Sequence, residues 1–185
     1  MKFLKHYNLE GKHALLGASK FHWIRYSDEK IAESYKKFRD IQRGTELHEL
    51  ASQLIKMNVK LPDEEKTLNM FVNDAIGFHM ESEQILLYSE NCFGTTDAIC
   101  FRNDILRIHD LKTGETKTHM EQLMIYAALF CLEYKVKPTE IGIILRIYQN
   151  NEIIELEPDS DDIVHIMDRI ITADKIISAI KEQEQ

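Results

Sequence analysis

The spacing of apolar residues changes after Glu81, and this change constrains the fold more than any other feature of the chain. Upstream of it, apolar residues recur every three or four positions, which is typical of amphipathic helices. Downstream, the runs QILLYSE, TTDAICF and DILRIHDL are short, rich in bulky and β-branched residues, and separated by polar breaks. These runs predict three strands, of which the last two form a hairpin. Helices and strands combined in this order favour an α/β fold.

The segments on either side of these strands have clear helical or strand spacing. A helical region is expected from about Ser27 to Asn58, with Gly44 as a candidate break between two helices, and LPDEEKTLNMFVNDAIGFHM predicts a further helix that starts at Pro62. After the strands, THMEQLMIYAALFCLEY predicts an apolar helix, and DDIVHIMDRIITADKIISAI predicts a long amphipathic one. Between them, IGIILRIYQ and NEIIELE predict a second hairpin that turns at Asn150-Asn151.

The composition suits one soluble domain that covers residues 1–185. With 44% hydrophobic residues the chain can fill a sizeable core, and no apolar stretch approaches the ~18 residues that a membrane span needs. We expect a mixed central sheet at about residues 81–157, flanked by a helical part at about 1–80 and a C-terminal helix at about 159–182. The early charges in MKFLKHYNLEGKH leave no secretory signal, so we expect a cytoplasmic protein without membrane contact.

The predicted hairpin brings two aspartates and a lysine together. If Arg102-Asn103 is the turn, Asp97 lies opposite Ile108, and Asp110 is its diagonal neighbour. Because side chains alternate across a strand, Asp97, Asp110 and Lys112 then share one face. A three-residue loop or a bulge would shift the register by one and move Asp97 to the other face, so this prediction depends on the turn.

This arrangement predicts a site for a divalent cation. Two carboxylates at this distance repel each other unless a cation lies between them, and hard oxygen ligands suit Mg²⁺ or Mn²⁺. A lysine beside such a site can orient or deprotonate a water molecule, or neutralise charge on a reacting phosphate, which suits phosphodiester hydrolysis. The simpler interpretation is that Asp110-Leu111-Lys112 is only a polar strand end that leads into the turn at Thr113-Gly114.

Several motifs in this region resemble one nuclease superfamily. Gly94 and Asp97 in GTTD, followed by Asp110 and Lys112 in DLKTG, resemble the core motif of the PD-(D/E)XK nucleases. GTELHELA at residues 44–51 resembles the GxxxH motif of the RecB-like exonuclease branch, and EQLMIYA at residues 121–127 resembles its QxxxY motif. In the phage and prophage members, a Glu-Gln strand precedes the GTxD segment, as Glu83-Gln84 does here. The resemblance covers roughly residues 14–130.

The resemblance implies a restriction-endonuclease-like core and a divalent-metal-dependent deoxyribonuclease, specifically an exonuclease acting in phage or prophage DNA metabolism or recombination. DNA with free ends is the implied substrate, and a helicase, a single-strand annealing protein and further copies of the chain are the candidate partners. The implied metal ligands are His48, Asp97, Asp110 and the carbonyl of Leu111. Lys112 and Glu83 join Asp97 and Asp110 as catalytic residues, and Gln122 and Tyr126 line the DNA path.

The segment LLGASKFHWIRYSDEK interleaves basic and aromatic side chains. Such a mixture can grip a single strand, because aromatic faces stack on bases while Lys and Arg contact phosphates. Ser19 is a further candidate, because RecB-like proteins often carry a serine near this position. We therefore expect DNA contacts from Ser19, Lys20, Trp23 and Arg25. In the alternative interpretation, Phe21 and Trp23 are core residues at the start of a helix.

Other readings of the chain stay open at this stage. The net charge of −8 favours a catalytically silent protein of the nuclease fold that binds DNA or a protein partner, for example a phage-encoded inhibitor. An RNA-directed nuclease would use the same residues. Taken alone, His48 would be an ordinary surface or core histidine. No cysteine precedes Cys92 or follows Cys131, and no Walker GxxxxGK[ST] sequence occurs, so we expect neither an iron–sulfur cluster nor ATP.

Overall fold

The computed structural model describes residues 5, 7–9, 14–114 and 118–184, and contacts divide the chain into two compact units, Met1–Thr45 and Glu46–Gln185. A long helix, α1 (Asp28–Lys56), contributes its first part to one unit and its last part to the other. The prediction of one nuclease domain over the whole chain stays a prediction. Within the described residues, no helix is long and apolar enough to cross a membrane.

The first unit contains two short 3₁₀ helices, η1 (Tyr7–Leu9) and η2 (Ala18–Arg25), followed by the first part of α1. Ser27 begins α1, because its hydroxyl accepts a hydrogen bond from the backbone N–H of Lys30 at 3.3 Å. The predicted break at Gly44 is wrong, because α1 is one uninterrupted helix through this residue. A single glycine weakens a helix by only about 1 kcal/mol, which the turns on both sides offset.

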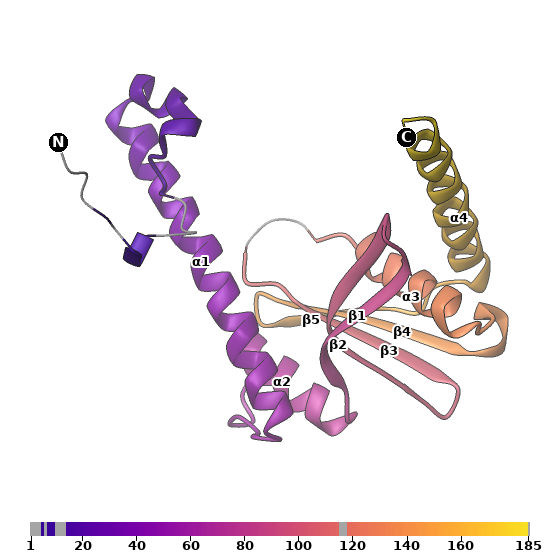
Figure 1. The fold of residues 1–185 in the computed structure, drawn as a ribbon. Coiled ribbons are helices and arrows are strands. Elements are labelled where there is room, and N and C mark those ends of the chain that lie inside the picture. The colour runs from indigo at the N-terminus through magenta and orange to yellow at the C-terminus, as the bar shows by residue number, and fades with distance from the viewer. Residues whose placement is uncertain (1–4, 6, 10–13, 115–117, 185) are drawn as a thin grey trace. The chain divides into compact units, whose positions relative to one another are not determined.

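The second unit is built around a five-stranded sheet, shown in Figure 1, with the order β1-β2-β3-β4-β5. Neighbouring strands are antiparallel except β3 and β4, which are parallel and are connected through the helix α3. The prediction of an α/β fold with a mixed sheet flanked by helices is confirmed. The strands are β1 (Glu81–Ser89), β2 (Cys92–Arg102), β3 (Ile105–Leu111), β4 (Gly142–Gln149) and β5 (Glu152–Leu156).

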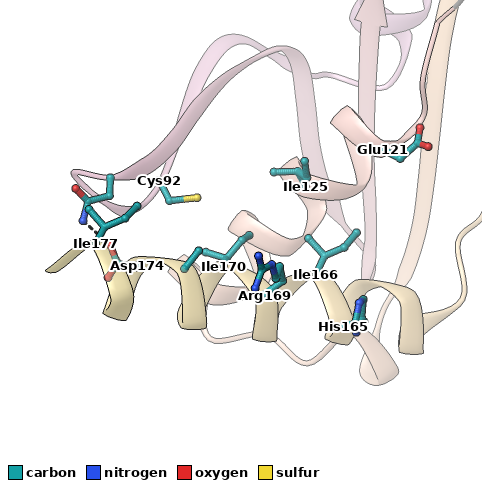
Figure 2. Close-up of a pocket in the computed structure, with 11 residues that line it drawn as sticks. Cys92, Glu121, Ile125, His165, Ile166, Arg169, Ile170, Asp174 and Ile177 are labelled. Atoms are coloured by element: carbon teal, nitrogen blue, oxygen red, sulfur yellow. Dashed lines mark hydrogen bonds between the residues drawn. The ribbon is translucent and has the colours of Figure 1, made fainter. Parts of the chain in front are cut away.

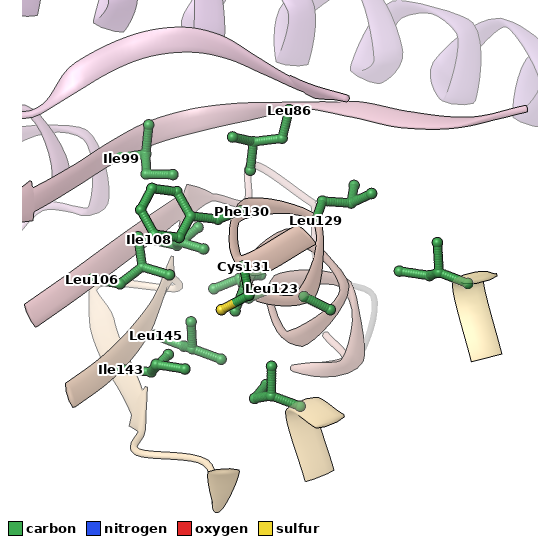
Figure 3. Packing of buried hydrophobic residues seen from close by; sticks show 14 of the residues in the cluster. Leu86, Ile99, Leu106, Ile108, Leu123, Leu129, Phe130, Cys131, Ile143 and Leu145 are labelled. Carbon is green, nitrogen blue, oxygen red and sulfur yellow. The ribbon is translucent and has the colours of Figure 1, made fainter. Parts of the chain in front are cut away.

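Two hydrophobic clusters form, one with α3 (Glu121–Tyr134) and α4 (Ser160–Gln183), the other with α2 (Thr67–Gly77) and the end of α1. Alternation along β3 produces this division, because Leu106 and Ile108 join the α3 cluster while Leu111 joins the α2 cluster. Figure 3 shows the side chains of β3 and β4 directed toward those of α3. Both faces of the central strands are therefore buried, which explains their nearly continuous apolar sequences.

The hairpin between β2 and β3 turns one residue later than predicted. Asn103 and Asp104 occupy the turn with φ of 49° and 58°, so Ile99, not Asp97, pairs with Ile108. Such a turn needs positive φ at both central positions, and Asn and Asp tolerate this better than Arg does. The pairing moves by two residues, which is a whole period of the strand, so the predicted faces are unchanged.

The remaining elements follow the predicted order with different boundaries. The hairpin of β4 and β5 turns at Asn150 and Asn151 as predicted, with φ of 52° and 61°. The helix expected from Pro62 begins only at Thr67, where α2 starts. The preceding loop is fixed instead by the side chain of Asn73, which exchanges two hydrogen bonds with the backbone of Leu61 at 2.9 and 3.0 Å.

Candidate metal centre

Three carboxylates lie at the same level on three neighbouring strands. In the β1–β2 ladder, Ser82 pairs with Ala98 and Gln84 pairs with Thr96, which places Glu83 opposite Asp97. The last pair of the β2–β3 ladder is Ala98 with His109. Asp97 and Asp110 are the next residues of the two strands beyond this pair. Glu83, Asp97 and Asp110 therefore form a row across β1, β2 and β3, with Asp110 directly beyond Asp97 and not diagonal to it. Predicted register and observed register differ here, but the acidic pair is brought together in both.

The helix α1 adds a histidine to this row. The Nδ1 atom of His48 lies 3.2 Å from Oδ1 of Asp97. Ligand atoms of His48, Glu83 and Asp97 all lie within 4.8 Å of one another, which is a spacing that one metal ion can span. Glu83 was expected to assist catalysis, but its carboxylate belongs to this group of candidate ligands. Asp110 lies beside the group and is not one of its three members.

A pair of serines fixes the part of α1 that carries His48. The hydroxyls of Ser52 and Ser82 lie 2.9 Å apart and share a hydrogen bond. Ser52 is one helical turn after His48, so both side chains project from the same side of α1, and Ser82 directly precedes Glu83 in β1. The bond therefore positions the histidine and the glutamate relative to each other. Sequence analysis missed both serines, because neither belongs to a recognisable motif.

At Glu83, the alternation of side chains between the two faces of β1 is interrupted. Its φ of 54° is in the left-handed region, which disfavours residues other than glycine. Ser82 contacts α1, whereas Leu86, four residues later, packs in the α3 cluster on the opposite face of the sheet. In a regular strand these two side chains would share a face. Strained backbone of this kind concentrates at functional sites, where the surrounding structure over-determines it.

Beyond the last backbone pair of β2 and β3, the side chain of Asp97 connects the two strands. Its Oδ2 atom accepts a hydrogen bond from the backbone N–H of Leu111 at 2.8 Å, one residue beyond the last pair of the ladder. The other carboxylate oxygen faces His48. This bond fixes the orientation of the carboxylate and ties the end of β3 to β2. The carbonyl of Leu111 as a metal ligand stays a prediction.

A chain of polar contacts connects the acidic row with α3. The ammonium of Lys112 lies 3.0 Å from Oδ2 of Asp110 and donates hydrogen bonds to its Oδ1 at 3.2 Å and to Oε1 of Gln122 at 3.0 Å. Gln122 in turn donates to the hydroxyl of Tyr126 at 3.2 Å. Residues from two separately predicted motifs are thus in direct contact. The ring of Tyr126 packs against Gly94, where an added Cβ would lie only 2.7 Å from Cε1.

The electrostatics of the site favour an additional positive charge. Asp110 is only 4% exposed, and burial together with the nearby Asp97 carboxylate raises its pKa, although Lys112 opposes this shift. Burial and Asp97 also raise the pKa of Glu83. The hydrogen bond to Asp97 raises the pKa of His48 against the opposing effect of burial. Oδ2 of Asp110 is buried, and among the described residues its polar contact is the ion pair with the Lys112 ammonium at 3.0 Å, without hydrogen-bond geometry. Carboxylates that are partly buried and repel one another are suitable ligands for a cation, because the cation neutralises their charge.

The four predicted DNA contacts in the N-terminal segment, Ser19, Lys20, Trp23 and Arg25, all lie on η2 in the first unit. No residue of η2 is buried, and Phe21 is 52% exposed. The indole N–H of Trp23 donates a hydrogen bond to the carbonyl of Gly17 at 3.1 Å. The alternative interpretation, in which Phe21 and Trp23 are core residues, is wrong for the exposed Phe21, whereas Trp23 is half-buried.

A second polar cluster lies on the other face of the sheet. His109 alternates away from Asp110, as expected, and its Nδ1 lies 3.2 Å from the hydroxyl of Tyr148. That hydroxyl donates a hydrogen bond to Asp74 of α2 at 2.6 Å, and Arg146 donates to the same carboxylate at 3.1 Å. The residues come from three elements that are distant in sequence, so no local signal pointed to them. The cluster connects α2 with β4 and with β3, the strand that carries Asp110.

A groove of about 390 Å³ lies away from these polar groups, between α3, α4 and the turn from β1 to β2. Figure 2 shows Ile125 of α3 and Ile166 and Ile170 of α4 directed into it, with Cys92 at one end. Its lining is almost entirely apolar. It contains none of Glu83, Asp97, Asp110 or His48 and therefore does not belong to the candidate metal centre.

The comparisons with known proteins give similarity without an assigned activity. A family described as "Protein of unknown function (DUF2800)" matches residues 79–150, a range that includes Glu83, Asp97, Asp110, Lys112 and Tyr126. A solved structure titled "Crystal structure of SSO0001" is similar with a TM-score of 0.38 and 18% sequence identity, over 82% of this chain and 68% of that chain. A likeness this weak carries no functional argument. No curated protein matches the chain.

Proposed function

We propose that this chain is a divalent-metal-dependent deoxyribonuclease of the PD-(D/E)XK superfamily, from the phage and prophage type of the RecB-like exonuclease branch. The observation that carries the proposal is the grouping of His48, Glu83 and Asp97 within 4.8 Å, directly beside the ion pair of Asp110 and Lys112. A histidine, three carboxylates and a lysine at the end of a central strand are the groups that metal-assisted phosphodiester hydrolysis needs.

The donor set fits a hard divalent cation. Carboxylate oxygens suit Mg²⁺ and Mn²⁺, and an imidazole nitrogen is also accepted by Mn²⁺. His48, Glu83 and Asp97 would hold the ion, together with the neighbouring Asp110 and the Leu111 carbonyl. When bound, such an ion polarises a scissile phosphate and makes a water molecule more acidic.

The other residues of the site would orient the substrate and move protons. Lys112 is held between Asp110 and Gln122, so its Nζ atom is fixed at the edge of the acidic row. From there it neutralises charge on the phosphate or exchanges a proton with the attacking water. Gln122 and the hydroxyl of Tyr126 continue this polar line along α3 and would contact the DNA backbone. The same proposal includes DNA ends as the substrate and a helicase or annealing protein as the partner. It also includes self-association of the chain and a cytoplasmic location.

The test is cleavage of labelled DNA by wild-type protein and by single variants. Linear and circular substrates, single- and double-stranded and labelled at either end, are incubated with Mg²⁺, Mn²⁺ or EDTA. We expect metal-dependent degradation of linear DNA only, with its direction given by the end label. Asp110→Asn and Lys112→Ala should each lower the rate at least about 100-fold, because each removes a group of the proposed chemistry. Asp168→Asn, which neutralises an exposed carboxylate on α4, should leave the rate unchanged.

Three results would contradict parts of this proposal. Cutting of circular DNA would make the protein an endonuclease, and faster cutting of matched RNA would change the substrate. Absence of cleavage under all metal conditions would reject the enzyme and favour the silent nuclease-fold protein. A thermal shift keeps the metal site testable by itself, because Mn²⁺ should raise the unfolding temperature of wild type but not of Asp97→Asn.

A further inference from the structure

The two units of the chain have opposite net charges. Residues 1–45 contain ten Lys and Arg against five Asp and Glu, a net charge of +5, whereas residues 46–185 contain 13 against 26, a net charge of −13. The overall charge of −8 conceals this division. A polyanionic substrate approaching the acidic unit is repelled at long range, while the basic unit attracts it. Because the acidic unit repels such a substrate, binding to the basic unit would help to keep the substrate near the site.

Basic side chains on α1 form a stripe in the first unit. Lys36, Arg39 and Arg43 follow one another at three- and four-residue intervals, which places them along one side of the helix. All three are exposed, and none forms an ion pair within the described part of the chain. Between Lys36 and Arg43, Asp40 is the acidic residue on this side, so this part of the stripe keeps a net charge of +2.

The first unit also exposes its apolar and aromatic side chains. No apolar side chain among its described residues is buried. Phe21 is 52% exposed, Ile24 63%, Tyr35 54% and Ile41 63%. Tyr35 directly precedes Lys36, and the ring of Phe21 contacts that of His22 at 4.3 Å. Exposed aromatic rings and cations without ion-pair partners on one unit suit a partner that offers both negative charge and flat apolar faces.

We propose that residues 21–43 of the first unit carry a binding surface for single-stranded DNA, distinct from the acidic metal centre. This inference rests on the proposed nuclease function and names the form of DNA that the nuclease holds. Lys36, Arg39 and Arg43 contact consecutive phosphates, and Phe21 and Tyr35 stack on unpaired bases. Single strands present both features, because their bases are free to rotate onto aromatic side chains. A duplex would engage the cations but leave the rings exposed.

Trp23 makes the proposal testable without a label. It is the only tryptophan of the chain and lies in the first unit, so tryptophan fluorescence reports on this unit alone. Full-length protein carrying Asp110→Asn is titrated in EDTA with a 20-nucleotide oligothymidylate at several salt concentrations. We expect quenching or enhancement that saturates, with a dissociation constant that rises steeply with salt.

Two variants separate the phosphate contacts from stacking. The triple change Lys36→Gln, Arg39→Gln and Arg43→Gln should reduce the slope of log K against log salt by roughly 2, because each phosphate contact with a single strand contributes about 0.7. It should also weaken binding at least about tenfold. Tyr35→Ala should weaken binding roughly fivefold or more without changing the slope. Both variants should keep the fold, because the changed positions are exposed and Gln and Ala are compatible with a helix.

The matched control removes the same charge from the acidic unit. Lys60→Gln, Lys135→Gln and Lys175→Gln replace three exposed lysines of the second unit and should leave both affinity and slope unchanged. Equal losses in this control and in the α1 triple variant would overturn the proposal, because net charge alone would then explain binding. Tighter binding of a hairpin duplex than of oligothymidylate would overturn the assignment to single strands.

The inference and the proposed function fail in different assays. If wild type degrades DNA but the α1 triple variant binds and degrades it equally well, the nuclease stands and the binding surface is wrong. If oligothymidylate binds as expected but no metal ion supports cleavage, the binding surface stands and the nuclease is wrong. If oligothymidylate leaves the fluorescence of Trp23 unchanged and an end-labelled oligothymidylate is not bound either, the binding surface is wrong.

Discussion

Gly94 shows how one residue can decide the shape of the site. A side chain at this position would meet the ring of Tyr126, because an added Cβ lies 2.7 Å from Cε1. Tyr126 in turn accepts the hydrogen bond of Gln122, which holds Lys112. The glycine therefore allows α3 to approach β2 closely enough for this polar line to form.

A double-mutant cycle tests this role. Gly94→Ala should lower the free energy of unfolding by about 1–3 kcal/mol, because the ring must move away from an overpacked position. In a Tyr126→Ala background, the same change should have little effect, because the clash is absent. Urea unfolding of the four proteins measures both values. Equal losses in the two backgrounds would show that Gly94 is needed for another reason.

His109 gives the chain a defined dependence on acid. The pKa of this buried side chain is lowered from about 6.5 to about 3, mainly by burial and further by the nearby Arg146 and Arg107. The unfolded chain protonates this histidine below pH 6.5, whereas the folded chain keeps it neutral until about pH 3. Stability from this group is complete above pH 6.5 and is lost as the pH falls below it.

The expected loss is up to about 1.4 kcal/mol per pH unit between pH 6 and pH 4. His109→Phe keeps an aromatic ring against Phe78 but removes the titrating group, so its unfolding free energy should fall less steeply with acid. Urea unfolding in EDTA at pH 7.5, 6 and 5 compares the two proteins. Parallel pH profiles would mean that His109 does not carry this part of the acid sensitivity.

At the scale of elements, the turn of the β2–β3 hairpin sets the position of the acidic row. Asn103 and Asp104 both have positive φ, and this turn fixes the pairing that brings Asp97 next to Asp110. The residues RND allow either of two positions for the turn. The observed one satisfies the twist of the strands, whereas a turn at Arg102-Asn103 would force arginine into a left-handed conformation.

A β-branched residue at this turn should destabilise the hairpin. Asn103→Val places a stiff side chain at φ of 49° and should lower the free energy of unfolding by about 1–3 kcal/mol. Arg102→Val, one residue earlier at the exposed end of β2, serves as the matched control and should change it by less than about 0.5 kcal/mol. Denaturant unfolding monitored by circular dichroism distinguishes them. An equal effect of both changes would argue against the left-handed turn.

At the scale of the whole molecule, the unequal charges of the two units predict opposite effects of salt. The second unit carries a net charge of −13, so its acidic groups repel one another and salt should reduce this repulsion. The same salt weakens the attraction between the basic first unit and DNA. The chain should therefore become more stable and bind oligothymidylate less tightly as salt increases.

Calorimetry checks the first of these effects. In EDTA at pH 8, raising NaCl from about 50 to about 500 mM should increase the unfolding temperature by several degrees. Carboxylates are fully charged at this pH, which maximises the repulsion that salt removes. A fall in unfolding temperature over the same range would mean that attractive ion pairs, such as that of Asp110 and Lys112, outweigh the net repulsion.

The order of the main helices and strands, and the face that Asp97 and Asp110 share, are predictable from the residues alone. Apolar periodicity specifies both, and the strand period of two preserved the shared face although the turn was misplaced by one residue. The motif with Lys112 and the separate motif with Gln122 and Tyr126 are likewise linear patterns of the sequence.

The contacts between these elements arise from packing over long distances in the sequence. The left-handed backbone of Glu83 and the bond between Ser52 and Ser82 depend on packing between elements that are distant in sequence. These contacts place His48 against Asp97 and move Glu83 into the group of candidate ligands. Periodicity describes the face of one element, whereas such contacts depend on the mutual placement of several, and no local pattern encodes that placement.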